Sequence, residues 1–131
     1  MELSVDKASY TSLGLSLPSY SIRNKPSPRV NASAVFDTGA QLNMTSPATV
    51  NKLGYSMTDL FKVSTNVNSA SNAKIHIIGG ILLQVKATNW ETGVTIKSKQ
   101  LFYVSEQVTE TYLSLDCCKQ LQTIPPDFPA V

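Results

Sequence analysis

Short apolar runs separated by turn residues constrain the fold of this chain more than any other feature. Extended segments are expected at residues 29–36, 41–45, 61–67, 75–85, 94–104 and 111–115, because strand-forming residues recur there between Gly, Pro, Asn and Ser. Two brief helices are expected, one capped by Ser46 and ending at Gly54, the other over residues 116–121. This order predicts an all-β architecture, a closed or partly closed β-barrel with one or two short helices, and not a parallel α/β sheet.

The length of the chain fits one domain. It has 131 residues, 42% of them hydrophobic, which is enough for a modest core. We expect a main domain over residues 29–124. Residues 1–28 form a partly flexible lead-in with an edge strand near residues 13–18, where apolar residues alternate, and residues 125–131 form an extended tail.

Charge and targeting signals exclude several classes of partner. The net charge is +2 and no dense Lys/Arg run occurs, so no nucleic-acid partner is expected. No apolar run is long enough for a membrane span, and no signal peptide is recognisable. We therefore expect an intracellular protein with no membrane partner, in which the Asn-X-Ser/Thr triplets at Asn31 and Asn43 are chance matches.

Cysteine and histidine usage gives no basis for a metal or a cofactor. Cys117 and Cys118 are adjacent, so they offer neither a disulfide framework nor a metal-ligand spacing, and we expect both to be reduced and structural. His76 is the only histidine and lies in an apolar run without a nearby Cys or acid, which argues against a metal site or a Ser-His pair.

One acid occurs in a setting suited to catalysis. In the run Ala34-Val35-Phe36-Asp37-Thr38-Gly39-Ala40, a predicted strand leads directly into a glycine turn. Gly39 lets the backbone turn tightly without a side chain over the Asp37 carboxylate. An ordinary Asp-Thr-Gly turn explains the tripeptide equally well, since Asp and Gly are common turn residues, and the rest of the sequence must decide.

The order of features along nearly the whole chain resembles the retropepsin family of aspartic proteases. In that family a hydrophobic pair precedes Asp-Thr/Ser-Gly-Ala, and a short helix, a β-hairpin flap and a C-terminal helix follow. The corresponding parts here are Val35-Phe36-Asp37-Thr38-Gly39-Ala40, residues 47–53, a flap around residues 68–74, and Tyr112-Leu113-Ser114-Leu115-Asp116. Proteases embedded in polyproteins of long-terminal-repeat retrotransposons are the most similar, partly because of the Pro-rich segment after the last helix.

The resemblance implies an acid-protease half-fold and an aspartic endopeptidase that processes a polyprotein, in the cytoplasm or within retroelement particles. Asp37 would be the catalytic acid, Thr38 would form hydrogen bonds across a dimer, and Gly39 would keep the approach clear. The substrate would contact Ala40 and the flap residues Ser69, Ala70, Ser71, Asn72 and Ala73.

Peptide hydrolysis of this kind requires two carboxylates that share one proton, and the chain supplies one in the right setting. Asp116 lacks a glycine turn and is better explained as a helix-start residue. We therefore expect a homodimer in which a two-fold axis brings two copies of Asp37 together. The partners are then a second copy of the chain and an extended peptide.

The chain departs from the family pattern at two positions, and one rival flap position and two alternative functions stay open. Ser114 stands where the family usually has Gly, and Leu115 where retroviral members have Arg, so we expect apolar contacts at the dimer base. Gly79-Gly80 is a rival for the flap tip, although its flanks are too apolar for an exposed loop. The function has two alternatives as well: a dimerisation or binding module of the same fold that cleaves weakly or not at all, and a β-barrel binding domain with an incidental turn.

Overall fold

The computed structural model describes residues 1–15, 29–36, 42–63, 67–68, 74–89 and 92–121. Their helices are α1 (Lys7–Ser12), α3 (Pro47–Lys52) and α4 (Leu115–Gln120), with a single 3₁₀ turn, η1 (Met57–Asp59). Their strands are β1 (Glu2–Val5), β2 (Val30–Asn31), β3 (Ala34–Phe36), β4 (Asn43–Thr45), β5 (Val67–Asn68), β6 (Lys74–Ile75), β7 (Gly79–Thr88), β8 (Thr95–Val104) and β9 (Thr111–Leu113).

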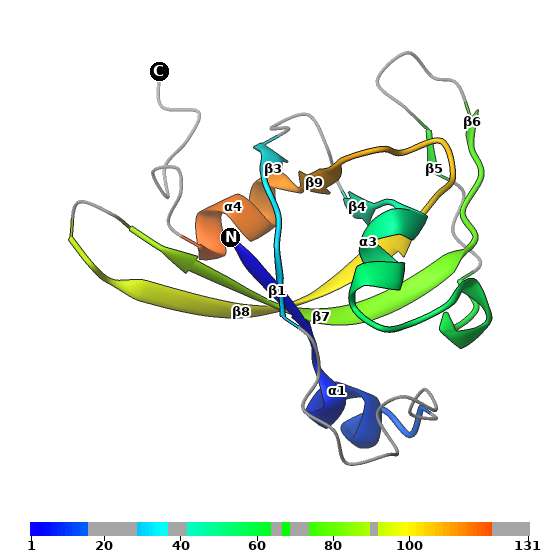
Figure 1. Ribbon diagram of the computed structural model, residues 1–131, viewed down its shortest axis with the longest axis horizontal. Coiled ribbons are helices and arrows are strands. Elements are labelled where there is room, and N and C mark those ends of the chain that lie inside the picture. The colour runs from blue at the N-terminus through cyan, green and yellow to red at the C-terminus, as the bar shows by residue number, and fades with distance from the viewer. Residues whose placement is uncertain (16–28, 37–41, 64–66, 69–73, 90–91, 122–131) are drawn as a thin grey trace.

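A curled sheet of seven strands, in the order β2-β1-β7-β8-β4-β9-β3, forms the body of the molecule. Figure 1 shows β7 and β8 as a long bent ribbon below the short strands β3, β9 and β4. The helices are six residues long each, so the predicted all-β class is confirmed. The segment expected at residues 29–36 is divided into β2 and β3, and that at 94–104 is the single strand β8.

Three segments in succession form hydrogen bonds with β7 on the side opposite β8. β1 pairs antiparallel with residues 83–86 of that strand. Where β1 ends, the Asp6 N–H donates to the Leu82 carbonyl at 3.0 Å, and the Leu82 N–H donates to the Tyr10 hydroxyl at 3.1 Å. Further along, Phe61 and Gly80 exchange two backbone hydrogen bonds of 3.1 and 2.9 Å. The edge is thereby closed to pairing with another chain over this length.

The first residues of the lead-in are built into the sheet as β1, which lies between β2 and β7. Residues 13–15, the described part of the expected edge strand, form no strand and follow helix α1. Helix α1 follows β1 because the Asp6 carboxylate accepts from the Ser9 N–H at 3.3 Å and caps it, and Leu13 is the C-cap. Residues 16–18 lie outside the described residues.

The two faces of β8 contribute to two apolar clusters, because successive side chains of a strand point to opposite faces. Phe102 and Val104 belong to the main core and are fully buried, while Tyr103 belongs to a smaller cluster on the other face. The main core contains Leu3, Val5, Tyr10, Val50, Leu53, Tyr55, Ile81, Leu83, Val85, Phe102, Val104, Leu113, Cys117, Cys118 and Leu121. It therefore joins β1, α1, α3 and α4 to the sheet.

Helix α3 confirms the prediction made from its capping residues. The Ser46 hydroxyl accepts from the Thr49 N–H at 3.3 Å, and Pro47 is the first helical residue, where its missing N–H costs nothing. Beyond the C-cap Leu53, Gly54 adopts a positive φ of 87°. Val50 is fully buried and fixes the helix on the core.

Candidate functional site

Strand β3, which the predicted catalytic acid follows in the sequence, belongs to a junction of three strands. β9 lies between β3 and β4, parallel to the former and antiparallel to the latter. Phe36 pairs with Leu113, so Asp37 and Ser114 are the residues that directly follow a matched pair at one end of two parallel strands. Asp37, Thr38, Gly39 and Ala40 themselves lie outside the described residues.

Asn43 joins the strands at this junction through its buried side chain, which is 5% exposed. Its Oδ1 accepts from the Ser114 N–H at 2.8 Å, and its Nδ2 donates to Gln100 Oε1 at 3.0 Å and to the Leu101 carbonyl at 3.2 Å. The side chain thus connects β4 to the end of β9 and to β8. Because a buried amide must have partners, this network fixes the end of β9, whose last residue Leu113 pairs with Phe36 of β3.

Sequence reasoning missed this role of Asn43, which it noted only as part of a glycosylation triplet. A polar residue between Leu42 and Met44 was the available signal, since an asparagine in an apolar strand is buried only with partners. The amide nitrogen that a glycan would modify is engaged in two hydrogen bonds here.

Ser114 caps a helix, which gives the serine at this position a structural role. Its φ of −66° and ψ of 161° are ordinary for any residue, and it is the N-cap of α4. The Cys117 N–H donates to its hydroxyl at 3.2 Å, and the residue is 5% exposed. The helix predicted over residues 116–121 is confirmed with a start one residue earlier, and Asp116 lies exposed in its first turn.

The hairpin predicted as a flap has its two arms in the described residues. β5 and β6 pair antiparallel, with Val67 opposite Ile75 and Asn68 opposite Lys74, and they stand at one end of the β7–β8 ribbon in Figure 1. The predicted substrate-binding residues Ser69, Ala70, Ser71, Asn72 and Ala73 connect these arms and lie outside the described residues.

Gly79 and Gly80, the rival tip, are buried in β7. A Cβ at Gly79 would lie 2.9 Å from the Phe61 carbonyl oxygen, and one at Gly80 would lie 2.7 Å from the Phe61 ring. These glycines therefore allow the 60–63 segment to approach β7 closely.

The smaller apolar cluster lies at the base of the hairpin. Met44, Tyr103 and Val108 are its buried members, and the partly buried Leu42, Val63, Ile75, Ile77, Leu101 and Tyr112 pack against them. Ile75 ends β6 and Ile77 lies between β6 and β7, so the cluster joins the hairpin base to side chains of β4, β8 and β9.

The other acids near structured elements have local roles. Asp6 caps α1, where its carboxylate accepts from both the N–H and the hydroxyl of Ser9. Asp59 accepts from the Ser56 N–H at 2.9 Å in a capping box. Neither acid, nor Asp116, follows a strand into a glycine turn, and Asp127 lies outside the described residues.

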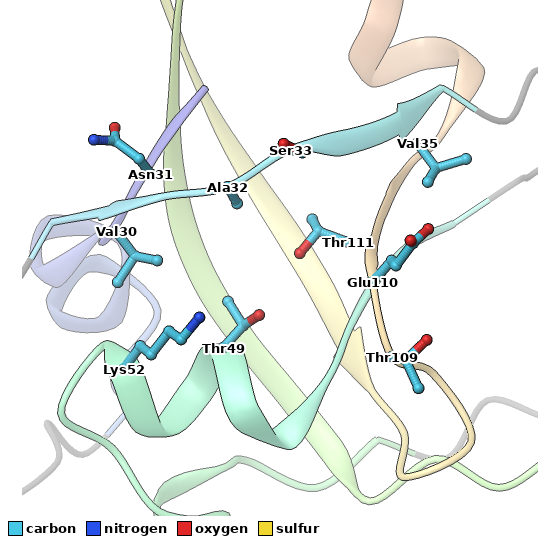
Figure 2. Close-up of a pocket in the computed structure, with 10 residues that line it drawn as sticks. All are labelled: Val30, Asn31, Ala32, Ser33, Val35, Thr49, Lys52, Thr109, Glu110 and Thr111. Atoms are coloured by element: carbon cyan, nitrogen blue, oxygen red, sulfur yellow. The ribbon is translucent and has the colours of Figure 1, made fainter.

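A pocket of about 260 Å³ separates the β2–β3 segment from α3, as Figure 2 shows. Thr49 and Lys52 of the helix extend toward the strand side in this view. The lining residues are Val30, Asn31, Ala32, Ser33, Val35, Thr49, Lys52, Thr109, Glu110 and Thr111. Glu110 is the one carboxylate among them, so this pocket does not itself hold a pair of acids.

Cys117 and Cys118 are both fully buried, and the Cys117 thiol is free. Burial, reinforced by the neighbouring Cys118, raises the pKa of the Cys117 thiol to about 12, which keeps it protonated and unreactive at neutral pH. Within the described ranges, no three His, Cys, Asp or Glu residues gather closely enough to hold a metal ion.

Comparison with known proteins gave no family assignment: no family model matches the chain, and neither a curated protein nor a solved structure matches it. No helix in the described part of the chain has the length and apolar character needed to cross a membrane.

Proposed function

We propose that the chain is a retropepsin-like aspartic endopeptidase that acts as a homodimer. The observation that supports the proposal is the sequence Asp37-Thr38-Gly39, which directly follows the last residue of β3, and β3 is the edge strand that pairs with β9. A catalytic group is best placed next to a rigid element, and the residue before Asp37 belongs to a strand that is paired with β9. The Asn43 network supports it, because it fixes the neighbouring strand ends.

The chemistry needs two copies of Asp37. The ionised carboxylate of one chain would remove a proton from a water molecule as that water attacks the peptide carbonyl carbon. The protonated carboxyl group of the other chain would give its proton to the carbonyl oxygen, which forms a tetrahedral diol. The C–N bond would then break as the carboxyl that took the proton from water passes it to the amine nitrogen, while a diol hydroxyl returns its proton to the other carboxylate. Two acids in contact cannot both ionise readily, so the pair would share one proton and the activity would fall at both low and high pH. No metal or cofactor enters these steps.

The substrate would be an extended peptide that lies across the dimer beneath the β5–β6 hairpins. Main-chain hydrogen bonds to strand edges would orient it, and movement of the hairpins would control entry of peptide and water. The apolar cluster at the hairpin base supports this arrangement, since it packs Ile75 and Ile77 against the buried Tyr103 and so anchors the hairpin on the sheet. Processing of a retroelement polyprotein inside the cell is the biological setting we propose.

Cleavage of a peptide library, measured together with the molar mass of the same sample, tests the proposal. The wild-type protein should cleave with inhibition by pepstatin, and Asp37→Asn should abolish cleavage while the molar mass stays that of a dimer. Asp116→Asn is the matched control, because that acid is exposed in the first turn of α4, and it should retain full activity.

Two outcomes would contradict the proposal. Cleavage that persists in Asp37→Asn would show that another group supplies the acid. A wild-type dimer that cleaves no peptide in the library would instead favour a binding or dimerisation module of the same fold.

A further inference from the structure

The arm that joins β6 to β7 is attached to the sheet at two points. The Ile78 N–H donates to the Val104 carbonyl at 2.8 Å. Two residues nearer the hairpin, the His76 N–H donates to the Oε1 atom of Gln107 at 2.7 Å. The second bond uses a side chain that is 31 residues away in the sequence, from the turn that follows β8.

That turn holds Gln107 in a defined place. Ser105 is fully buried, its hydroxyl accepts from the Gln107 N–H at 3.2 Å, and its own N–H donates to the Thr45 carbonyl at 3.3 Å. The Val108 N–H returns to the Ser105 carbonyl at 3.2 Å, and Val108 is buried in the smaller apolar cluster. The backbone of Gln107 is thus fixed on β4, while its side chain is exposed and reaches the arm.

We propose that Gln107 is a positioning residue that tethers the hairpin arm at His76 to the turn after β8 and so sets the direction in which the β5–β6 hairpin leaves the sheet. This inference rests on the proposed function for its effect on substrate. The tether is a single exposed hydrogen bond to a neutral side chain, whose net strength is small. It therefore opens and closes readily, as a segment that must move during turnover requires.

Three variants separate the tether from a general effect on stability. Gln107→Met keeps the length of the side chain and removes the oxygen acceptor, whereas Gln107→Glu keeps an acceptor oxygen in the same place. Gln120→Met is the matched control, because Gln120 bonds to Ser98 and Gln100 and makes no described contact with the hairpin.

Backbone amide exchange, read by NMR, tests the tether without any need for activity. In Gln107→Met the His76 amide should exchange about three- to tenfold faster, which corresponds to the loss of one modest hydrogen bond. The Ile78 amide should be unaffected, because its acceptor is a backbone carbonyl in β8. Gln107→Glu and Gln120→Met should both exchange at His76 as the wild type does.

Peptide cleavage kinetics test the positioning role. A tether that favours the closed hairpin in the ground state and the transition state alike should act on KM. Gln107→Met should therefore raise KM about three- to tenfold, with kcat within about a factor of two of the wild-type value, and Gln107→Glu should restore KM.

Unchanged His76 exchange in Gln107→Met would overturn the tether, and faster exchange with an unchanged KM would overturn its positioning role. If the wild-type protein cleaves no peptide, the proposed function and the effect on KM both fail. The exchange data still decide whether the tether exists.

Discussion

Removal of the Asn43 side chain should destabilise the protein strongly, because this buried amide connects β4 with both β8 and β9. In Asn43→Ala the Ser114 N–H loses its 2.8 Å acceptor, and an unsatisfied buried donor costs about 1–3 kcal/mol. The bonds from Nδ2 to Gln100 and Leu101, 3.0 and 3.2 Å long, contribute about 0.5–1.5 kcal/mol each. Half-buried Gln100 recovers part of its share by bonding elsewhere, so we expect a loss of about 3 kcal/mol in all.

This loss converts into a shift of the thermal midpoint. For a chain of 131 residues, an unfolding entropy of about 2.1 cal/mol/K per residue gives about 0.28 kcal/mol/K. A loss of about 3 kcal/mol therefore lowers the midpoint by about 11 °C. Scanning calorimetry at pH 7 measures it directly.

Asn31→Ala is the control for this prediction, because Asn31 is exposed in β2. Its free energy of unfolding should stay within about 0.5 kcal/mol of the wild-type value, a shift of about 2 °C. If Asn43→Ala melts no lower than Asn31→Ala, the Asn43 network does not hold the strand junction.

Three further predictions concern the core. Burial raises the pKa of the Tyr10 phenol from 10.0 to about 12, so the fold favours the neutral form; this stabilisation is complete below pH 10 and is lost as the pH rises through about 12. In urea titrations, the free energy of unfolding of Tyr10→Phe should therefore fall less with rising alkaline pH than that of the wild type. At pH 7 the variant should be less stable by about 1–3 kcal/mol, because the Leu82 N–H loses its acceptor. An equally steep decrease with pH in the variant would refute this. Gly79→Ala should cost about 1–3 kcal/mol in the same titrations, because the new Cβ would lie 2.9 Å from the Phe61 carbonyl oxygen, and a neutral result would mean that the 60–63 segment can shift. The Cys117 thiol should react with a thiol reagent only as fast as the protein opens, and immediate modification of the folded protein would contradict its burial.

The features that the sequence predicted well are those with local causes. Helix α3 follows from Ser46 and Pro47, because capping and the restricted φ of proline act within one turn. The β5–β6 hairpin follows from two extended runs on either side of a small polar segment. These signals do not depend on which strand lies beside which.

The errors and omissions arose where distant residues decide the structure. The alternation of apolar residues near residues 13–18 predicts a strand. Residues 13–15 instead follow a helix, which Asp6 caps and which Tyr10 fixes on β7. No local pattern indicates that β9 lies between β3 and β4, and the role of Asn43 depends on that order. For the candidate site, the sequence predicted the hairpin arms, which the structure contains, whereas the role of Asp37 stays a prediction because that residue lies outside the described ones. The strand junction and the Gln107 contact were visible only in the structure.

Mixing wild-type protein with Asp37→Asn tests most directly whether each chain holds half of an active site. With a ninefold excess of the variant and full exchange of subunits, about one tenth of the wild-type chains pair with each other. If two copies of Asp37 form one site, cleavage per wild-type chain should fall to about one tenth of its value in the absence of the variant. Cleavage that is unchanged by the variant would mean that each chain carries a complete site, and it would contradict the account.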